Sequence, residues 1–195
     1  MKLQLPEGEF EGYIFDCDGT LADTMPLHYQ AWSRVLSEEG AEFSEDLFYA
    51  WGGRPASEII TAINRRDGLK MSVEEIVARK ESLFRSLQRG VQPIAAVVEI
   101  ARNSRGLLPM AVASGGLREV VLETLDHLGI RDFFDVILGV EDYARGKPAP
   151  DPFLEAARRM SVQPERCLVF EDSVFGIEAA RAAKMAWVLV PQHHE

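Results

Sequence analysis

The chain has 195 residues and a formal net charge of −10, with 47% hydrophobic and 27% charged residues. The acidic balance disfavours a main role in coating the phosphates of DNA or RNA, and the mixed composition disfavours a disordered chain. No run of 18 apolar residues is present, so we expect no membrane span. The first residues lack the apolar core of a secretory signal, which predicts a cytoplasmic protein.

Short apolar runs alternate with helical patterns along most of the chain. The runs predict five strands, at residues 12–16, 108–114, 134–138, 166–170 and 186–190. Several are apolar throughout, which is typical of parallel strands buried on both faces. Apolar residues at i, i+3 and i+4 predict helices over 117–128, 152–160 and 176–184. This alternation predicts a doubly wound α/β domain.

One stretch breaks the alternation. From about residue 25 to residue 90 the sequence has only helical patterns. Helices with apolar faces of their own must pack against something, so we expect this insertion to form a separate helical lobe. We assign residues 1–21 and 91–195 to the main domain and residues 22–90 to the inserted lobe.

The strongest local signal is FDCDGTLAD, directly after the first predicted strand. Asp16 and Asp18 are two residues apart, so in a regular strand their carboxylates would point to the same side. Two carboxylates so close repel each other unless a divalent cation or different protonation states relieve the repulsion. Taken alone, such a motif is as often a solvated turn.

A second acidic pair weakens the interpretation of Asp16 and Asp18 as part of a solvated turn. Glu171 and Asp172 follow another apolar run and come directly before a helix. Ligands of open α/β sheets bind at the carboxyl ends of the strands. Carboxylates at two strand ends can converge on one Mg²⁺, which takes oxygen ligands and keeps waters for a substrate phosphate.

Two further segments have groups that a phosphate needs. Ser114 and Gly115 close the second predicted strand and precede a helix, where a hydroxyl and bare backbone N–H groups form an anion site. In isolation, the same residues are better explained as a helix N-cap. Lys147 lies in a loop that two prolines stiffen. Because the loop is stiff, the interpretation that Lys147 reaches a phosphate is favoured over the interpretation that it is an ordinary solvated charge.

These four motifs, in this order, resemble those of the haloacid dehalogenase superfamily. The stretches FDCDGTLADT, GKPAPDPF and FEDSVFGIEAARAA are similar to those of its sugar-phosphate phosphatases and of β-phosphoglucomutase. The resemblance implies a Rossmann-like, doubly wound parallel sheet as the catalytic core at residues 1–21 and 91–195. It also implies an α-helical cap at residues 22–90, inserted after the first strand.

The resemblance further implies a role for each motif residue. Asp16 would attack phosphorus and form an aspartyl-phosphate, and Asp18 would serve first as general acid and then as general base. Mg²⁺ would be held by Asp16, the backbone carbonyl of Asp18 and Asp172, with Glu171 orienting a water on the metal. The phosphoryl oxygens would be bound by Thr20, Ser114, Gly115 and Lys147.

Substrate choice would belong to the cap. His28, Arg54 and Lys80 stand at positions that resemble substrate-contacting places in the family. The residues by themselves have plainer interpretations. In these interpretations, His28 packs against other side chains or caps a helix, and Arg54 and Lys80 are charges exposed to solvent.

One departure from the family pattern concerns the backbone. Lys184 stands where relatives usually have glycine. Because a left-handed lysine costs about 1 kcal/mol or more, we expect a rearranged turn at this position.

The sequence therefore predicts a Mg²⁺-dependent phosphatase that acts on a small phosphorylated metabolite, with a sugar phosphate favoured. The first alternative is a phosphomutase of the β-phosphoglucomutase type, which returns the phosphoryl group to a sugar. The second is a catalytically silent binding module, against which the intact Asp16, Asp18, Lys147 and Asp172 argue. We expect a monomer whose partner is its phosphate ester substrate, with neither nucleic acid nor membrane as a partner.

Overall fold

A computed structural model describes residues 3–52 and 54–191 of the chain. The chain divides into two compact units, one made of Met1–Asp23 and Val91–Glu195 and the other of Thr24–Gly90. We call them the sheet unit and the helical unit. Among the helices of the described residues, none combines the length and the apolar character that a membrane crossing requires.

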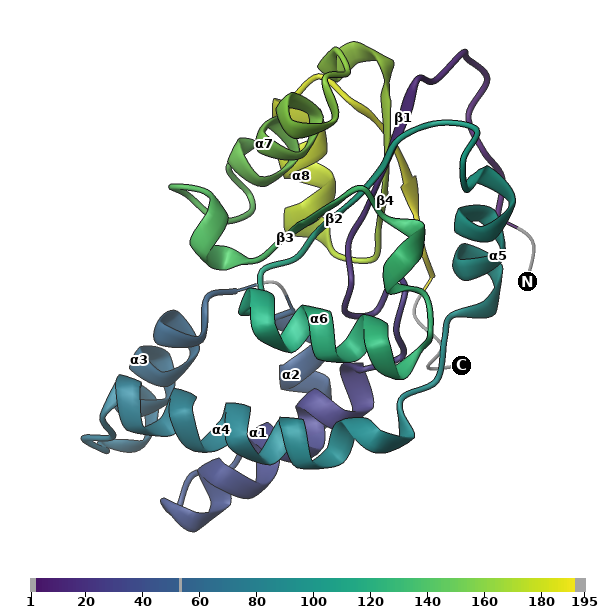
Figure 1. The fold of residues 1–195 in the computed structure, drawn as a ribbon. Helices are drawn as coiled ribbons and strands as arrows, with labels where there is room; N and C mark the ends of the chain where they lie inside the picture. The colour runs from purple at the N-terminus through teal and green to yellow at the C-terminus, as the bar shows by residue number, and fades with distance from the viewer. Residues whose placement is uncertain (1–2, 53, 192–195) are drawn as a thin grey trace. The chain divides into compact units, whose positions relative to one another are not determined.

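Over its described residues, the sheet unit has five parallel strands in the order β3-β2-β1-β4-β5, and Figure 1 labels the first four of them along the chain. The strands are β1 Gly12–Phe15, β2 Met110–Ala113, β3 Val136–Leu138, β4 Cys167–Glu171 and β5 Ala186–Leu189. Phe15 pairs with Val112 on one side and with Phe170 on the other. Because the strands are parallel, their carboxyl ends lie along one edge of the sheet.

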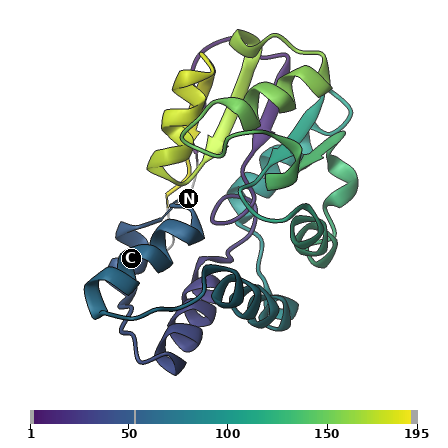
Figure 2. The ribbon, with the colours of Figure 1, turned by 90° about the vertical axis from the view of Figure 1, so that its left-hand side faces the viewer.

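Helices cover both faces of the sheet. On one face Phe15, Val112 and Phe170 pack against helices α5 (Ala95–Ser104) and α6 (Arg118–His127). On the other, Ile14 and Val169 pack against α7 (Asp151–Met160) and α8 (Val174–Ala182), which Figure 2 brings to the viewer's side. Burial on both faces explains the continuous apolar runs in the sequence. The doubly wound α/β fold expected from them is confirmed.

Helix α5 is a part of this architecture that the sequence did not predict. Residues 94–101 are apolar except for Glu99. The segment therefore has no polar face by which a helix could be distinguished from an apolar strand. Three short 3₁₀ segments complete the sheet unit: η2 Arg131–Phe133, η3 Val140–Asp142 and η4 Pro164–Arg166.

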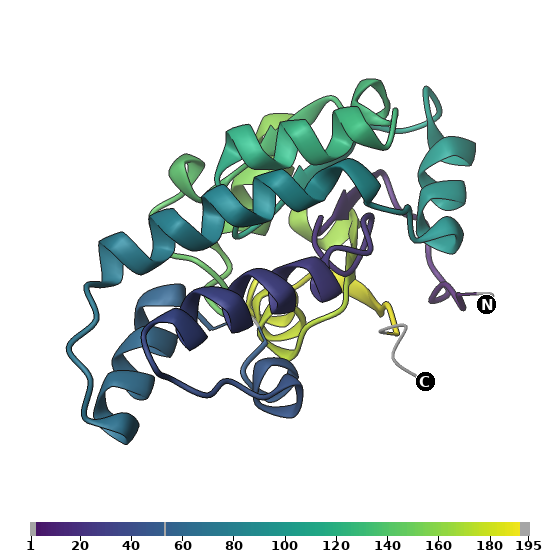
Figure 3. The same ribbon diagram turned by 90° about the horizontal axis from the view of Figure 1, so that it is seen from below.

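The helical unit has its own core, as expected for an insertion with apolar helix faces. Its helices are α1 Met25–Glu38, α2 Glu45–Ala50, α3 Ala56–Asp67 and α4 Val73–Leu87, followed by the 3₁₀ turn η1 Gln88–Gly90. Helices α1 and α4 run side by side in opposite directions (Figure 3). Trp32, Phe43, Ile60 and Ile76 lie among the buried residues between the helices.

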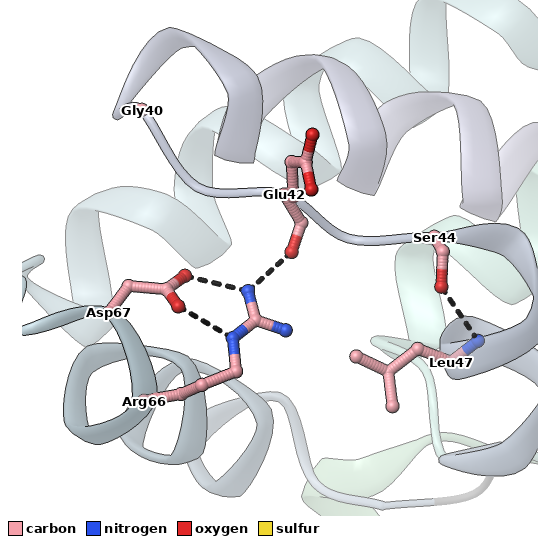
Figure 4. A pocket seen from close by; sticks show the side chains of 6 residues that line it. All are labelled: Gly40, Glu42, Ser44, Leu47, Arg66 and Asp67. Carbon is pink, nitrogen blue, oxygen red and sulfur yellow. Dashed lines mark hydrogen bonds and ion pairs between the residues drawn. The ribbon is translucent and has the colours of Figure 1, made fainter.

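A pocket of about 480 Å³ in the helical unit has a polar lining (Figure 4). The Arg66 guanidinium donates to both carboxylate oxygens of Asp67, at 2.6 Å each, and to the backbone carbonyl of Glu42. Asp67 thus neutralises the positive charge of Arg66. The lining residues Gly40, Glu42, Ser44, Leu47, Arg66 and Asp67 include none of the predicted site residues.

The prediction of a rearranged turn at Lys184 is wrong. Lys184 has a φ of 59°, so the lysine adopts the left-handed conformation that glycine would adopt with less strain. Its N–H donates to the carbonyl of Arg181, and the next N–H, of Met185, donates to Ala180. Ala183 and Met185 are both buried, so packing on each side holds the short link between α8 and β5 in place.

Candidate active site

The acidic residues of the first and fourth motifs meet at the carboxyl ends of β1 and β4. These strands are neighbours, and Asp16 directly follows β1, where its N–H donates to the carbonyl of Phe170. Carboxylate oxygens of Asp16, Glu171 and Asp172 all lie within 4.8 Å of one another. Asp16 and Glu171 are buried. The sheet register therefore brings together the two acidic pairs that the sequence placed at separate strand ends.

A tight turn after β1 positions the rest of the first motif. The carbonyl of Cys17 accepts the N–H groups of Thr20 and Leu21, and Gly19 has a φ of 80° that permits the reversal. The hydroxyl of Thr20 donates to Asp172 Oδ1 at 3.3 Å. The turn is thus attached to the acidic pair at the end of β4.

Lys147 enters the same cluster from the loop before α7. Its Nζ donates to Asp16 Oδ1 and to Glu171 Oε1, both at 2.6 Å. Burial alone would lower the pKa of Lys147, but the carboxylates of Asp16 and Glu171 outweigh this effect and raise it. The ammonium therefore stays charged, and the interpretation of Lys147 as a solvated surface charge is wrong.

The carboxyl group of Asp16 is under opposing influences. Burial raises its pKa well above the ordinary value, Lys147 acts to lower it, and the carboxylates of Glu171 and Asp172 raise it further. Burial has the largest effect, and Lys147 opposes it by favouring the ionised form of Asp16.

Glu171 is held rigidly by groups on both of its oxygens. Oε1 accepts from Lys147, and Oε2 accepts from the N–H of Ser173 at 2.6 Å. Gly176, in the first turn of α8, leaves the space that this side chain fills, since a Cβ there would lie only 2.5 Å from Glu171 Cγ and closer still to its carboxyl group. Gly176 is a site residue that the sequence pattern did not indicate. A glycine inside a helix, where it is unfavourable, was the available signal.

Ser114 begins the loop after β2. Its hydroxyl accepts from the N–H of Gly116 at 3.0 Å and lies 3.5 Å from Asp18 Oδ2. The N-cap of α6 is Leu117, so the interpretation of Ser114 as a helix N-cap is wrong. Ser114 orders the start of the loop, and its role in binding phosphate stays a prediction. Tyr143, which the sequence pattern did not indicate, donates its hydroxyl hydrogen to the carbonyl of Ser114 at 2.8 Å.

The donor set suits a hard divalent cation. The carboxylates of Asp16, Glu171 and Asp172 form the cluster, and the ammonium of Lys147 donates to the first two. Oxygen ligands are those that Mg²⁺ prefers. The excess of negative charge is what a divalent cation would balance, so these residues fit one.

The helical unit holds the three predicted substrate residues. The ring of His28 stacks on Phe84 with centroids 3.8 Å apart, and its Nδ1 lies 2.9 Å from Lys80 Nζ. Lys80 is buried and also donates to Glu81 at 2.8 Å. The structure brings His28 and Lys80 together, while the Arg54 guanidinium lies 5.1 Å from the ring centre of Trp51. Lys80 is not the solvent charge of the plainer interpretation.

Comparison with known proteins gives consistent findings. The family model described as haloacid dehalogenase-like hydrolase matches residues 13–190. The chain is 39% identical over 177 residues to the fructose-1-phosphate phosphatase of Escherichia coli (strain K12), covering 90% of this chain and 94% of the relative. It is 32% identical over 177 residues to a phosphorylated carbohydrates phosphatase of Thermotoga maritima, covering 89% and 81% of the two chains.

Solved structures show a related fold. A crystal structure of β-phosphoglucomutase from Clostridium difficile superposes with a TM-score of 0.79 at 25% identity, covering 91% of this chain and 83% of the other. That of CbbY from Rhodobacter sphaeroides in complex with phosphate has a TM-score of 0.83 at 26% identity, covering 95% and 89%.

Proposed function

The chain belongs to the haloacid dehalogenase-like hydrolases, as its four motifs predicted, and from this membership we propose that it is a phosphatase of sugar phosphates. One observation carries the proposal: the buried ammonium of Lys147 lies between the carboxylates of Asp16 and Glu171, at the strand ends where Asp172 and Ser114 also lie. Relatives named as phosphatases of fructose 1-phosphate and of phosphorylated carbohydrates support the substrate class.

The reaction has two displacements at phosphorus. Asp16 attacks the phosphoryl group, the bond from phosphorus to the substrate oxygen breaks, and Asp18 gives its proton to the departing alcohol. Water then attacks the aspartyl-phosphate and gives a proton to Asp18, and the bond to Asp16 breaks to release phosphate. Two neighbouring carboxyl groups in different protonation states make this division of roles possible.

The remaining motif residues stabilise charge. Lys147 favours the ionised form of Asp16 and, with the hydroxyl of Ser114 and the N–H of Gly115, binds phosphoryl oxygens. Asp16, Asp172 and the backbone carbonyl of Asp18 would hold Mg²⁺. When bound, the cation supplies positive charge against the negative charge of the transferring group.

Substrate selection falls to the helical unit as the cap of the enzyme. In this proposal Lys80, whose ammonium contacts His28 and Glu81, recognises a polar group of the sugar. Arg54 is a further substrate contact in this proposal.

The test is phosphate release from a panel of sugar phosphates and short-chain phosphate esters. We expect turnover with MgCl₂, loss of turnover in excess EDTA, and no turnover by Asp16→Asn, because an amide is a poor nucleophile. Absence of phosphate release across the whole panel by folded wild-type protein would contradict the proposal. Turnover retained by Asp16→Asn would contradict the role of Asp16.

The likeness to the β-phosphoglucomutase structure supports a second candidate, a phosphomutase that uses the same aspartyl-phosphate. Interconversion of β-glucose 1-phosphate and glucose 6-phosphate, with the bisphosphate present, would identify it. Release of inorganic phosphate without interconversion would favour the phosphatase.

A further inference from the structure

The loop that follows β3 is attached along its length to the loop that follows β2. The N–H of Val140 donates to the carbonyl of Gly116 at 2.9 Å. The carboxylate of Glu141 accepts from the N–H of Arg118 at 3.0 and 3.3 Å. At Gly139 the two backbones approach so closely that a Cβ would lie 2.5 Å from Arg118 Cα. The loop after β3 therefore braces the start of α6.

Tyr143, in the same loop after β3, contacts a residue of the candidate site. Its hydroxyl donates to the backbone carbonyl of Ser114 at 2.8 Å, and Lys147 follows four residues later in the same loop. Burial raises the pKa of Tyr143 to about 12, and the charges of Lys147 and Asp16 also act on it. The hydroxyl therefore remains a donor at neutral pH, close to the charged groups of the site.

The accepting carbonyl belongs to the peptide unit that contains the N–H of Gly115. In a trans peptide the C=O and the N–H lie in one plane and point in opposite directions. A hydrogen bond that fixes the carbonyl of Ser114 thus also fixes the direction of the Gly115 N–H. Gly115 has open space where a side chain would be, so no side chain of its own limits the rotation of this peptide.

We propose that Tyr143 is a positioning residue that holds the Ser114–Gly115 peptide so that the Gly115 N–H is presented to the phosphoryl oxygens. The same tyrosine connects the two phosphate-binding loops, because its own loop carries Lys147. This inference rests on the proposed function, since it assigns to Tyr143 the orientation of a donor in the phosphatase site.

The test compares two identical chemical changes in the full chain. Tyr143→Phe removes the hydroxyl and keeps the ring, and Tyr13→Phe does the same at a ring that packs edge-on against Phe170. Each ¹⁵N-labelled protein is titrated with inorganic phosphate in MgCl₂ while the amide signal of Gly115 is followed by NMR. For Tyr143→Phe we expect the dissociation constant of phosphate to rise about tenfold, and for Tyr13→Phe to stay within about twofold of wild type.

A second readout separates positioning from stability. In Tyr143→Phe without phosphate, the Gly115 amide signal should already be shifted, because the peptide has lost the bond that fixes its plane. A general loss of stability would not move this single signal in the folded protein. We also expect kcat/KM to fall about tenfold for a sugar phosphate that the wild-type protein hydrolyses.

The outcomes distinguish the two proposals. Unchanged phosphate binding and an unchanged Gly115 signal in Tyr143→Phe would overturn the positioning role. A wild-type Gly115 signal that does not respond to phosphate would overturn it as well, whatever the activity. A wild-type protein that binds phosphate at Gly115 but hydrolyses no ester would refute the proposed function and leave the positioning role standing.

Discussion

Replacing Gly176 with alanine is expected to destabilise the protein, against the usual effect of this change in a helix. Gly176 lies in the first turn of α8, where alanine would ordinarily gain about 1 kcal/mol. Here the added methyl group would overlap the carboxyl group of Glu171, which is 1% exposed. Glu171 would have to leave its position, and its hydrogen bonds from Lys147 and from the N–H of Ser173 would break.

The size of the effect follows from these two hydrogen bonds. Each involves a charged group and contributes about 1.5–3 kcal/mol. After the gain in helix propensity is subtracted, we expect the free energy of unfolding to fall by about 2–5 kcal/mol. For a chain of this length, the melting temperature would fall by roughly 4–20 °C.

Urea unfolding of four proteins measures the effect and its cause. They are the wild type, Gly176→Ala, Glu171→Ala and the double variant. In the Glu171→Ala background the overlap is gone, so Gly176→Ala should be neutral or stabilising there. Equal destabilisation in both backgrounds would show that Glu171 is not the cause. A more stable Gly176→Ala single variant would refute the reasoning outright.

Two further predictions concern stability. Lys184→Gly should raise the free energy of unfolding by about 1 kcal/mol in urea melts, because φ of 59° strains a lysine and not a glycine, while Lys184→Ala should give no such gain. The raised pKa of Lys147 means that the folded state keeps a proton that the unfolded state loses. Its contribution to stability is therefore complete below about pH 10.4 and declines by about 1.4 kcal/mol per pH unit above it. The alkaline slope of Lys147→Met should be smaller than that of the wild type by this amount, and an equal slope in both proteins would contradict the charged pairing.

The parts of the site that sequence could predict are those that depend on strand order alone. Once parallel strands end in acidic residues, the geometry of the sheet brings Asp16 and Asp172 together. Contacts between loops are different, because they depend on how closely two backbones approach. Nothing in the pattern around Tyr143 indicates that its hydroxyl reaches Ser114, and the space that Gly176 leaves for Glu171 is visible only in three dimensions.

The same reasoning explains why the sequence pattern did not indicate the burial of Lys80 in the helical unit. A lysine at this point of a helical pattern is typical of an exposed charge. Its burial follows from neighbours far away in sequence, since His28 comes 52 residues earlier. The rings of Trp32 and Phe84 lie 5.8 and 5.1 Å from its Nζ, where a cation is attracted to an aromatic face.

Phosphate binding should depend on a divalent cation because of the charges that surround Lys147. The ammonium of Lys147 is already shared by Asp16 and Glu171, and Asp172 adds further negative charge. A phosphate dianion that enters this cluster alone meets like charges, each worth about 4 kcal/mol at 4 Å near a protein surface. A bound cation reverses the local sign. In calorimetric titrations we expect inorganic phosphate to bind at least about a hundredfold more weakly in EDTA than in MgCl₂. Equal affinity under both conditions would mean that Lys147 alone attracts the anion, and that the carboxylates do not act together as the cation site.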